Sequence, residues 1–164
     1  MKILFWVGYQ NPYWTKQTYL DKGIGGSEYC VLKLADYLDL KGHDVTISGD
    51  VNTGNYWGVK YINRGDLTKN LGPRGLTQPN NVQAYPHYDV VIATNYLHYI
   101  KHLEDLNIDF DRSYFWMHNE FFYKWYRGGE LHNWEQYLTH DKLNKVVGVS
   151  EYHEDILKNE FEAL

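Results

Sequence analysis

The sequence predicts an α/β protein in which a mainly parallel sheet is flanked by helices. Two observations carry this prediction. Short, almost continuous apolar runs recur along the chain, which is typical of strands buried on both faces, and segments with apolar residues at helical spacing separate these runs. Strands that alternate with helices indicate βαβ crossovers. A length of 164 residues predicts one domain, residues 1–164, with a real hydrophobic core.

The first strand and the first long helix come from the N-terminal quarter. Residues 2–8 form an apolar run that ends in glycine, and we expect a polar and aromatic loop over residues 9–23. The glycine-rich segment Gly23–Glu28 then leads into a helix, with Ser27 as its N-cap and Gly42 as its left-handed end. The buried stripe of this helix is predicted to comprise Val31, Leu34, Ala35 and Leu38, with Leu32 and a core Cys30 at its flanks.

The remaining elements follow in the same alternating pattern. Residues 43–48 predict a second strand and residues 57–62 a weaker third strand. Proline, glycine and asparagine are frequent in residues 64–86, which predicts a long surface loop. We then expect a strand at 88–94, a helix at 96–106, strands at 113–117 and 145–149, and a last helix from Ser150 with an exposed charged face.

Composition excludes several classes of protein. A net charge of −5 and a pI near 5.9 disfavour nucleic acid as the main partner. We expect no transmembrane segment, because no stretch approaches the roughly 20 apolar residues that a span needs. The single cysteine, Cys30, fits a reducing compartment, so we expect a cytoplasmic protein. The 16 tyrosines and 6 tryptophans suit either interfaces or sugar-stacking surfaces, and composition does not choose between them.

Ligands of parallel sheets bind outside the carboxyl ends of the strands. That rule points to the loop after Gly8, to Asn95, to the segment from His118 to Glu120, and to Ser150. A histidine at such a position can hydrogen-bond a substrate or transfer a proton. It can equally satisfy local backbone groups, and the residues around His118 leave both alternatives open.

The glycine-rich segment is a candidate anion site. Gly25 and Gly26 precede a helix N-terminus, where free N–H groups and the helix dipole favour a phosphate. The dinucleotide fingerprint would need a glycine where Glu28 stands, and about fifteen residues separate these glycines from the strand, so NAD or flavin binding is disfavoured. The phosphate-binding P-loop motif is absent. The alternative is a helix entry that binds nothing.

The candidate metal patterns are weak. His98 and His102 lie four residues apart on a predicted helix, but the sequence offers no third ligand, and a solvated helix face is the preferred interpretation. The motif Asp109-Phe110-Asp111 matches the D-x-D of metal-dependent sugar transferases, but we expect it to form a solvated turn before the next strand. We therefore expect no metal and no other cofactor.

In their order along the chain, these motifs resemble the N-terminal half of a retaining glycosyltransferase of family 4, which has the GT-B fold. The matching pieces are the opening Lys2–Phe5 strand, the helix start Gly25–Glu28, the helix-to-strand segment Leu40–Val45, the strand Tyr88–Ile92, His118 after the next strand, and Val147–Ser150. The resemblance spans nearly the whole chain.

The resemblance implies one Rossmann-like half of a two-domain enzyme with its active site between the halves. Gly25 and Gly26 would then lie near the diphosphate of a nucleotide sugar, and His118 would face the transferred sugar. Members of this family generally need no metal, because the helix dipole and basic side chains stabilise the leaving diphosphate. Position at the carboxyl ends of the strands adds five candidates for the acceptor pocket: Tyr9, Trp14, Asn95, Glu120 and Ser150.

The second half of such an enzyme, which binds the sugar donor, is not matched by this sequence. We therefore expect a chain that transfers a hexosyl group to an acceptor hydroxyl only with a donor-binding domain, in cis or in trans. The alternative is a non-enzymatic module with half of a GT-B fold, which binds a saccharide or a protein through its aromatic surface.

Overall fold

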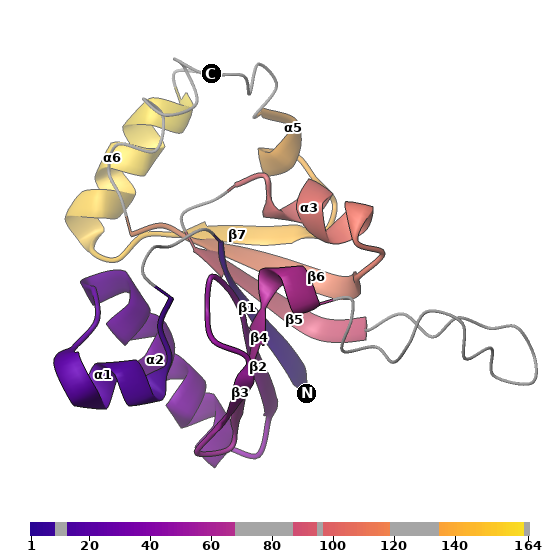
Figure 1. The fold of residues 1–164 in the computed structure, drawn as a ribbon. Helices are drawn as coiled ribbons and strands as arrows, with labels where there is room; N and C mark the ends of the chain where they lie inside the picture. Colours follow the sequence, from indigo (N-terminus) through magenta and orange to yellow (C-terminus); the bar gives the residue numbers. More distant parts are fainter. Residues whose placement is uncertain (9–12, 68–86, 95–96, 119–134, 163–164) are drawn as a thin grey trace, which may run out of the picture.

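The computed structural model describes residues 1–8, 13–67, 87–94, 97–118 and 135–162, and it confirms the α/β prediction (Figure 1). Within these residues a mostly parallel sheet of seven strands is flanked by helices. The strands are β1 (Lys2–Gly8), β2 (Asp44–Gly49), β3 (Gly54–Tyr56), β4 (Val59–Asn63), β5 (His87–Thr94), β6 (Asp109–Trp116) and β7 (Leu143–Val147). The helices are α1 (Lys16–Lys22), α2 (Gly26–Leu40), α3 (Tyr99–Asp105), α5 (Glu135–Leu138) and α6 (Glu151–Glu162), with a 3₁₀ turn η1 (Arg64–Asp66).

The strand order is β3-β4-β2-β1-β5-β6-β7. All neighbouring strands are parallel except β3 and β4, which form an antiparallel hairpin at one edge. Without β3, this is the 3-2-1-4-5-6 order of the Rossmann fold. Strand β1 lies at the centre, where Phe5 pairs with Ile47 on one side and with Ile92 on the other. The growth of the sheet changes direction between β1 and β5, which makes this the topological switch point.

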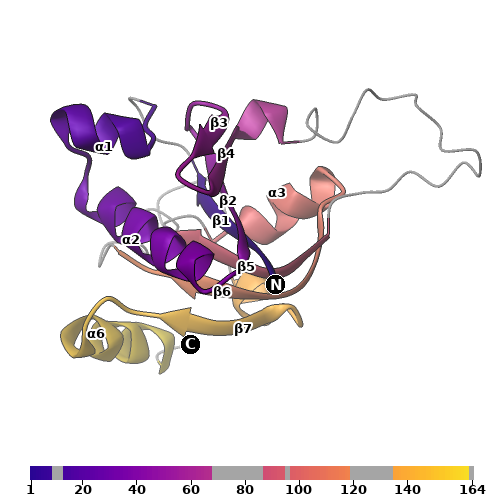
Figure 2. The same ribbon diagram turned by 90° about the horizontal axis from the view of Figure 1, so that it is seen from below.

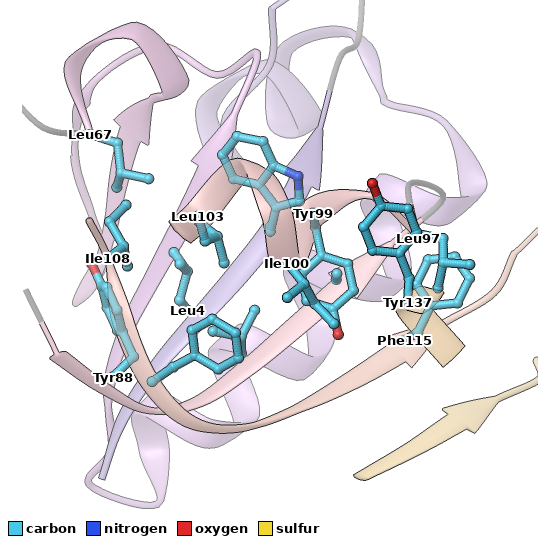
Figure 3. Close-up of a cluster of buried hydrophobic side chains, with 14 of the residues drawn as sticks. Leu4, Leu67, Tyr88, Leu97, Tyr99, Ile100, Leu103, Ile108, Phe115 and Tyr137 are labelled. Atoms are coloured by element: carbon cyan, nitrogen blue, oxygen red, sulfur yellow. The ribbon is translucent and has the colours of Figure 1, made fainter. Parts of the chain in front are cut away.

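Each face of the sheet carries its own core, because successive side chains of a strand point to opposite faces. On one face, Phe5 and Val7 of β1 pack with Val31 and Leu32 of α2. On the other face, Leu4 and Trp6 pack with α3 and with Tyr137 of α5. Figure 3 shows this second cluster, in which the side chains of α3 lie over the sheet. Figures 1 and 2 show α1 and α2 on the first face, α3 on the second, and α6 following the edge strand β7.

Helix α1 lies within the segment 9–23, for which we expected a loop. Its N-terminus is a capping box in which the Thr18 N–H donates to Thr15 Oγ1 at 3.4 Å and the Thr15 N–H donates to Thr18 Oγ1 at 3.1 Å. The usual sequence signal of this box has Glu or Gln at the third helical position. Threonine stands there instead, and the helix has no buried residue, so no apolar stripe indicates it.

The expected turn at Asp109-Phe110-Asp111 is wrong, because β6 already begins at Asp109. Asp109 pairs in register with His87 of β5, so the segment belongs to the sheet. The turn comes earlier, at Asn107, which has φ 54°. Asparagine tolerates this left-handed conformation because its short side chain bonds locally.

The long helix begins and ends close to the expected residues, but its cap differs. Gly25 is the N-cap of α2, and no side chain caps the helix. Ser27, the expected cap, instead donates from its hydroxyl to Glu28 Oε2 at 3.1 Å. Gly42 has φ 84°, which confirms the left-handed helix end. Cys30 is half-buried rather than a core residue, and Leu32, placed at the flank, is fully buried.

None of the helices formed by the described residues is both long enough and apolar enough to cross a lipid bilayer.

Candidate functional site

The six parallel strands all end at one edge of the sheet, here called the carboxyl edge; the opposite edge is called the amino edge. Helix α2 follows β1 and the short helix α1, and α6 directly follows β7, so both α2 and α6 begin at the carboxyl edge (Figures 1 and 2). Helix N-termini carry unpaired N–H groups and partial positive charge. The carboxyl edge therefore offers two positively polarised helix ends.

His118 lies two residues beyond the end of β6 at this edge. The Met117 N–H donates to the carbonyl of Val147 at 2.8 Å, which ties the segment after β6 to β7. The imidazole of His118 is half-buried and packs against Trp116, with ring centroids 4.5 Å apart. Its Nε2 is buried and has no hydrogen-bond partner among the residues that the structure describes. The ring is thus held by packing, while one nitrogen is left for a ligand.

The electrostatic neighbours of His118 come from two other elements. Burial is the main cause that lowers the pKa of His118; the Glu28 carboxylate raises this pKa, and His153 lowers it further. Glu28 stands in the first turn of α2 and His153 in the first turn of α6. The glycine-rich turn and His118 therefore lie at the same edge of the sheet, and the side chain of Glu28 acts electrostatically on the imidazole. The lowered pKa favours a neutral imidazole at pH 7.

His153 is built into the start of α6. Its side chain is only 5% exposed, and its Nδ1 accepts from the Val149 N–H at 3.3 Å. Its backbone N–H donates to Ser150 Oγ at 3.2 Å, so Ser150, an expected site residue, is the N-cap of α6. Ser150 itself is exposed. Sequence analysis did not single out His153, because nothing in its spacing distinguishes it from other helical polar residues.

The two glycines at the start of α2 differ in their surroundings. A Cβ on Gly25 would collide with the Glu28 carboxylate, which lies over the helix end. A Cβ on Gly26 would meet no atom within 4 Å. Neither residue has a positive φ. Glycine at 25 is thus explained by the close approach of Glu28, whereas glycine at 26 leaves open space at the first turn of a helix.

The structure places some of the expected site residues together and one elsewhere. Gly25 and Gly26, His118 and Ser150 share the corner of the carboxyl edge that Glu28 and His153 connect. Trp14 is 3% exposed and packs edge-on against Tyr61 with centroids 6.1 Å apart, so it belongs to the core rather than to an open pocket. Tyr9, Asn95 and Glu120 lie outside the described residues.

The expected solvated face of His98 and His102 is wrong, because both side chains are half-buried. His102 packs on Trp6 of the central strand, with ring centroids 4.7 Å apart. Burial is the main cause that lowers the pKa of each of these two histidines. The sequence did indicate that His102 would be partly buried, because Tyr99 and Leu103 lie near it on the apolar face of α3. Both of these residues are fully buried.

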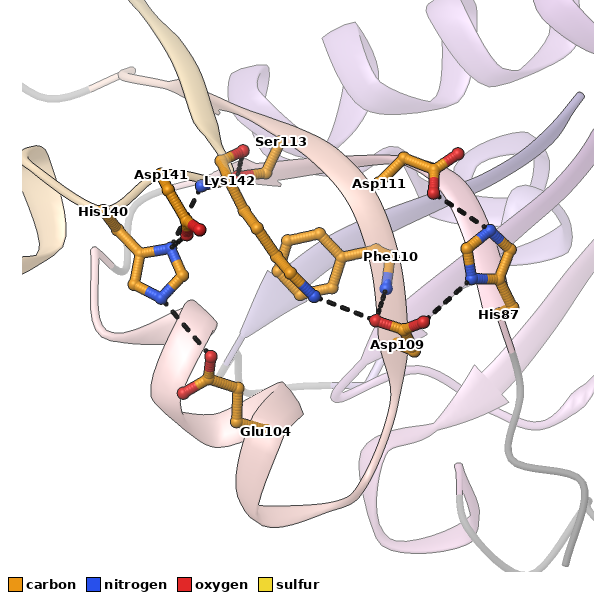
Figure 4. A network of polar contacts seen from close by, with 9 residues as sticks. All are labelled: His87, Glu104, Asp109, Phe110, Asp111, Ser113, His140, Asp141 and Lys142. Carbon is orange, nitrogen blue, oxygen red and sulfur yellow. Dashed lines mark hydrogen bonds and ion pairs between the residues drawn. The ribbon is translucent and has the colours of Figure 1, made fainter.

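A second polar cluster, which the sequence did not indicate, lies at the amino edge (Figure 4). His87 Nδ1 is 3.2 Å from Asp109 Oδ2, and His87 Nε2 is 3.3 Å from Asp111 Oδ1. Lys142 Nζ lies 2.9 Å from Asp109 Oδ1. These hydrogen bonds, from Lys142 and then His87, lower the pKa of Asp109 to about 2. The cluster links β5, β6 and the residue before β7.

The potential metal ligands of the described residues gather in this cluster and not at His118. Ligand atoms of His87, Asp89 and Asp111 lie within 4.8 Å of one another, the only such group of three in the described part of the chain. Asp89 already accepts from the Lys2 N–H at 2.6 Å. His87 and Asp111 are exposed. Exposed ion pairing explains this group without a bound cation.

Fold and site together define a class: an α/β protein of Rossmann-like topology, with a histidine beside a glycine-started helix at the carboxyl edge. Comparison with models of protein families, with curated proteins and with solved structures gives no significant match. The function is therefore argued from the residues themselves.

Proposed function

We propose that this chain is the acceptor-side domain of a retaining, GT-B-type glycosyltransferase. The reaction moves a hexosyl group from a nucleotide diphosphate sugar to an acceptor hydroxyl, with retention at the anomeric carbon. The single observation that carries the proposal is that the glycine-rich start of α2 and the histidine after β6 lie at the same edge of the parallel sheet, where the Glu28 carboxylate acts electrostatically on His118. The sequence resemblance requires this neighbourhood.

The chemistry of this corner suits a leaving diphosphate. The N–H groups of the first turn of α2 point to the carboxyl edge, and the helix dipole favours negative charge there. The Glu28 carboxylate already covers Gly25, so the diphosphate approaches on the side of Gly26, where an added Cβ would meet no atom of the described residues within 4 Å. Positioned N–H donors stabilise developing charge without a metal ion.

His118 orients the transferred sugar in this proposal. A neutral imidazole donates from one nitrogen and accepts at the other, which suits a sugar hydroxyl. Packing on Trp116 holds the ring in place. The donor nucleotide binds to a second domain, in cis or in trans. Tyr9, Asn95 and Glu120 stay candidates for the acceptor side, and the single Cys30, which forms no disulfide, supports a cytoplasmic place of action.

The experiment measures sugar transfer by the chain joined to, or mixed with, a donor-binding domain, using a panel of nucleotide sugars. We expect a product with retained anomeric configuration by NMR and no robust turnover by the chain alone. His118→Ala should lower kcat/KM by about 10²–10³, the usual loss when one charge-stabilising or orienting group is removed, without lowering Tm. His43→Ala at the amino edge is the matched control. Near-normal transfer by His118→Ala, or an inverted product, contradicts the proposal.

A second candidate is a saccharide-binding module without catalysis, and one exposed tryptophan favours it. The Trp57 side chain is 56% exposed, lies 6.5 Å from the Tyr56 ring, and has the Lys16 ammonium 5.3 Å from its centroid. Flat exposed rings suit the apolar face of a sugar. Saccharide titration followed by tryptophan fluorescence separates the two candidates: Trp57→Ala should abolish binding to such a module, whereas His118→Ala should leave that binding intact.

A further inference from the structure

The side chain of His153 has one satisfied nitrogen and one unsatisfied nitrogen. Because Nδ1 accepts from the Val149 N–H at 3.3 Å, the neutral ring carries its proton on Nε2. Nε2 is buried and meets no hydrogen-bond acceptor within the described ranges, although the side chain is only 5% exposed. A buried donor left without a partner costs free energy, so its retention calls for an explanation.

His118 offers a second nitrogen of the same kind. Its Nε2 is also buried and unpartnered with respect to the described residues. The segments that carry the two rings are joined: Trp116 pairs with Val147, the Met117 N–H donates to the Val147 carbonyl at 2.8 Å, and His153 Nδ1 accepts from the Val149 N–H. In keeping with this, His153 contributes to lowering the pKa of His118. They come from different elements, one after β6 and one from α6. Two unsatisfied imidazole nitrogens therefore gather between the first turns of two helices.

A phosphate group satisfies this arrangement better than a metal ion. The Nε2–H donor of His153 and the positive ends of α2, with 15 residues, and α6, with 12 residues, favour anionic oxygen, and the unpartnered Nε2 of His118 can donate to the same group as its Nε2-protonated tautomer. Glu28 on α2 acts on His118, and the exposed Glu151 and Glu154 stand in the first turn of α6 beside His153. Glu28, His118 and His153 do not form a three-ligand group among the described residues, whereas His87, Asp89 and Asp111 do.

We propose that His118 and His153 form an imidazole pair that binds one phosphate group of the substrate through their Nε2 atoms, beside the N-terminus of α2. This assignment deepens the proposed function and rests on it for the source of the phosphate, the diphosphate of the sugar donor. His118 then orients the transferred sugar through the phosphate bonded to its anomeric carbon rather than through a sugar hydroxyl. His153 is then a binding residue, and the Val149 N–H is the group that holds its ring in the donating tautomer.

The test uses two substitutions of His153 to distinguish the role of its Nδ1 from the role of its Nε2. His153→Asn keeps an acceptor near the Nδ1 position, so the bond from Val149 and the start of α6 are preserved, but it removes the Nε2 donor. His153→Gln places an amide donor near the Nε2 position. His140→Asn, in the loop before β7, is the control. Binding of pyrophosphate to the 164-residue chain is measured by calorimetry up to millimolar concentration, with inorganic phosphate, uridine diphosphate and glucose 1-phosphate as separate arms.

We expect His153→Asn to weaken pyrophosphate binding by roughly tenfold to a hundredfold, the usual effect of losing one hydrogen bond to a charged group. His153→Gln should retain most of the affinity, and His140→Asn all of it. Tighter binding of uridine diphosphate than of glucose 1-phosphate assigns the phosphate to the donor; the reverse order assigns it to a phosphorylated acceptor and overturns the donor assignment.

A second readout uses the unmodified protein. In long-range ¹H–¹⁵N spectra of the histidine rings, His153 should show the Nε2-protonated tautomer, and pyrophosphate should shift the His118 and His153 signals but not those of His140. The inference is overturned if His153→Asn binds like the unmodified chain, if Asn and Gln lower binding and Tm together, or if pyrophosphate shifts neither ring. Binding without sugar transfer would refute the proposed enzyme and leave the phosphate site standing.

Discussion

Lys142 Nζ lies 2.9 Å from Asp109 Oδ1, so the residue before β7 is bonded to the first residue of β6 (Figure 4). His87 of β5 completes this contact from the other side, at 3.2 Å from Asp109 Oδ2. The amino edge of the sheet is thus held by an ion pair and a histidine–carboxylate contact. The carboxyl edge instead contains imidazole nitrogens that find no partner in the described structure. The polar side chains of this amino-edge cluster are thus paired with one another, whereas the carboxyl edge keeps imidazole nitrogens that, among the described residues, are free to bind a ligand.

Asp109→Asn should destabilise the fold by about 0.5–1 kcal/mol at pH 7, since exposed ion pairs contribute little individually and the Asp109 side chain is 63% exposed. The folded state holds the pKa of Asp109 at about 2, below the unfolded value of about 3.9. The stabilisation is therefore complete above about pH 4 and is lost as the pH falls towards 2. Urea unfolding of both proteins between pH 7 and pH 2 measures the difference.

Asp155→Asn is the control for this prediction, because Asp155 has only a 3.7 Å contact with Lys158 on the exposed side of α6. It should change the free energy of unfolding by less than Asp109→Asn. A difference between Asp109→Asn and the unmodified chain that persists unchanged to pH 2 would show that the effect does not come from the charge.

Two fully buried serines should respond differently to removal of the hydroxyl. Ser113 Oγ accepts from the Tyr99 hydroxyl at 2.5 Å and donates to the Lys142 carbonyl at 3.0 Å. Ser113→Ala removes the acceptor of the buried Tyr99 hydroxyl, while the Lys142 carbonyl still accepts from the Ser113 N–H at 2.6 Å, and the change should cost about 1–3 kcal/mol. Ser48 is equally buried, but its hydroxyl has no hydrogen-bond partner among the described residues, so Ser48→Ala should be nearly neutral or stabilising. Chemical unfolding at pH 7 compares them; equal losses would disprove the role of the Tyr99–Ser113 bond.

Gly26→Ala should separate stability from ligand binding. A Cβ at Gly26 meets nothing within 4 Å, and alanine is a better helix former by up to about 1 kcal/mol, so Tm should be unchanged or higher. If the phosphate approaches this turn, pyrophosphate binding should nevertheless fall by about tenfold or more, because the added methyl group blocks the backbone N–H groups.

Gly25→Ala is the companion variant. Its Cβ collides with the flexible end of Glu28, so the carboxylate must move away from the helix start. Its pyrophosphate affinity should fall less than that of Gly26→Ala, since a negative charge leaves the site. Unchanged pyrophosphate binding by Gly26→Ala would place the ligand elsewhere.

Acidification should destabilise the protein through its buried histidines. Burial lowers the pKa of His98, His102 and His118, so the unfolded chain binds more protons than the folded chain below about pH 6.5. The free energy of unfolding should therefore fall as the pH drops from 7.5 towards 5.

His102→Gln tests one contribution to this pH dependence. His102 packs on Trp6, and its charged neighbours act in opposite senses, Arg64 lowering and Asp105 raising its pKa. The variant should reduce the slope of stability with pH by less than about 1.4 kcal/mol per pH unit, the limit for one proton. His43→Gln serves as the control at the amino edge. An unchanged slope in His102→Gln would assign the pH dependence to the other histidines.

The local hydrophobic pattern was enough to predict the fully buried strands. It was not enough where pairing with a distant segment determines whether a residue belongs to a strand. The apolar runs at 2–8 and 88–94 predicted β1 and β5 to within one residue, because a strand buried on both faces needs apolar side chains throughout. Residues 109–112 alternate charged and apolar, and only pairing with β5 makes them part of β6. Helix α1 was missed for a local reason: its capping box has threonine at the third helical position, and the helix has no buried residue that would form an apolar stripe.

In the candidate site, too, some residues could be predicted from the sequence and others only from the structure. Its glycines and His118 were recognisable from the sequence, because each follows or precedes an element whose position in a parallel sheet is determined by the pattern. His153 was not, since its importance comes from burial and from a partner, Val149, that settles its tautomer. His102 likewise changed from a solvated residue to one packed on Trp6.

The sequence by itself therefore determined the class of fold and which segment ends meet at the carboxyl edge, because hydrophobic periodicity selects strands and helices locally. Only the tertiary structure decided which nitrogens there are left without partners, since hydrogen-bond satisfaction depends on neighbours that lie far away along the chain.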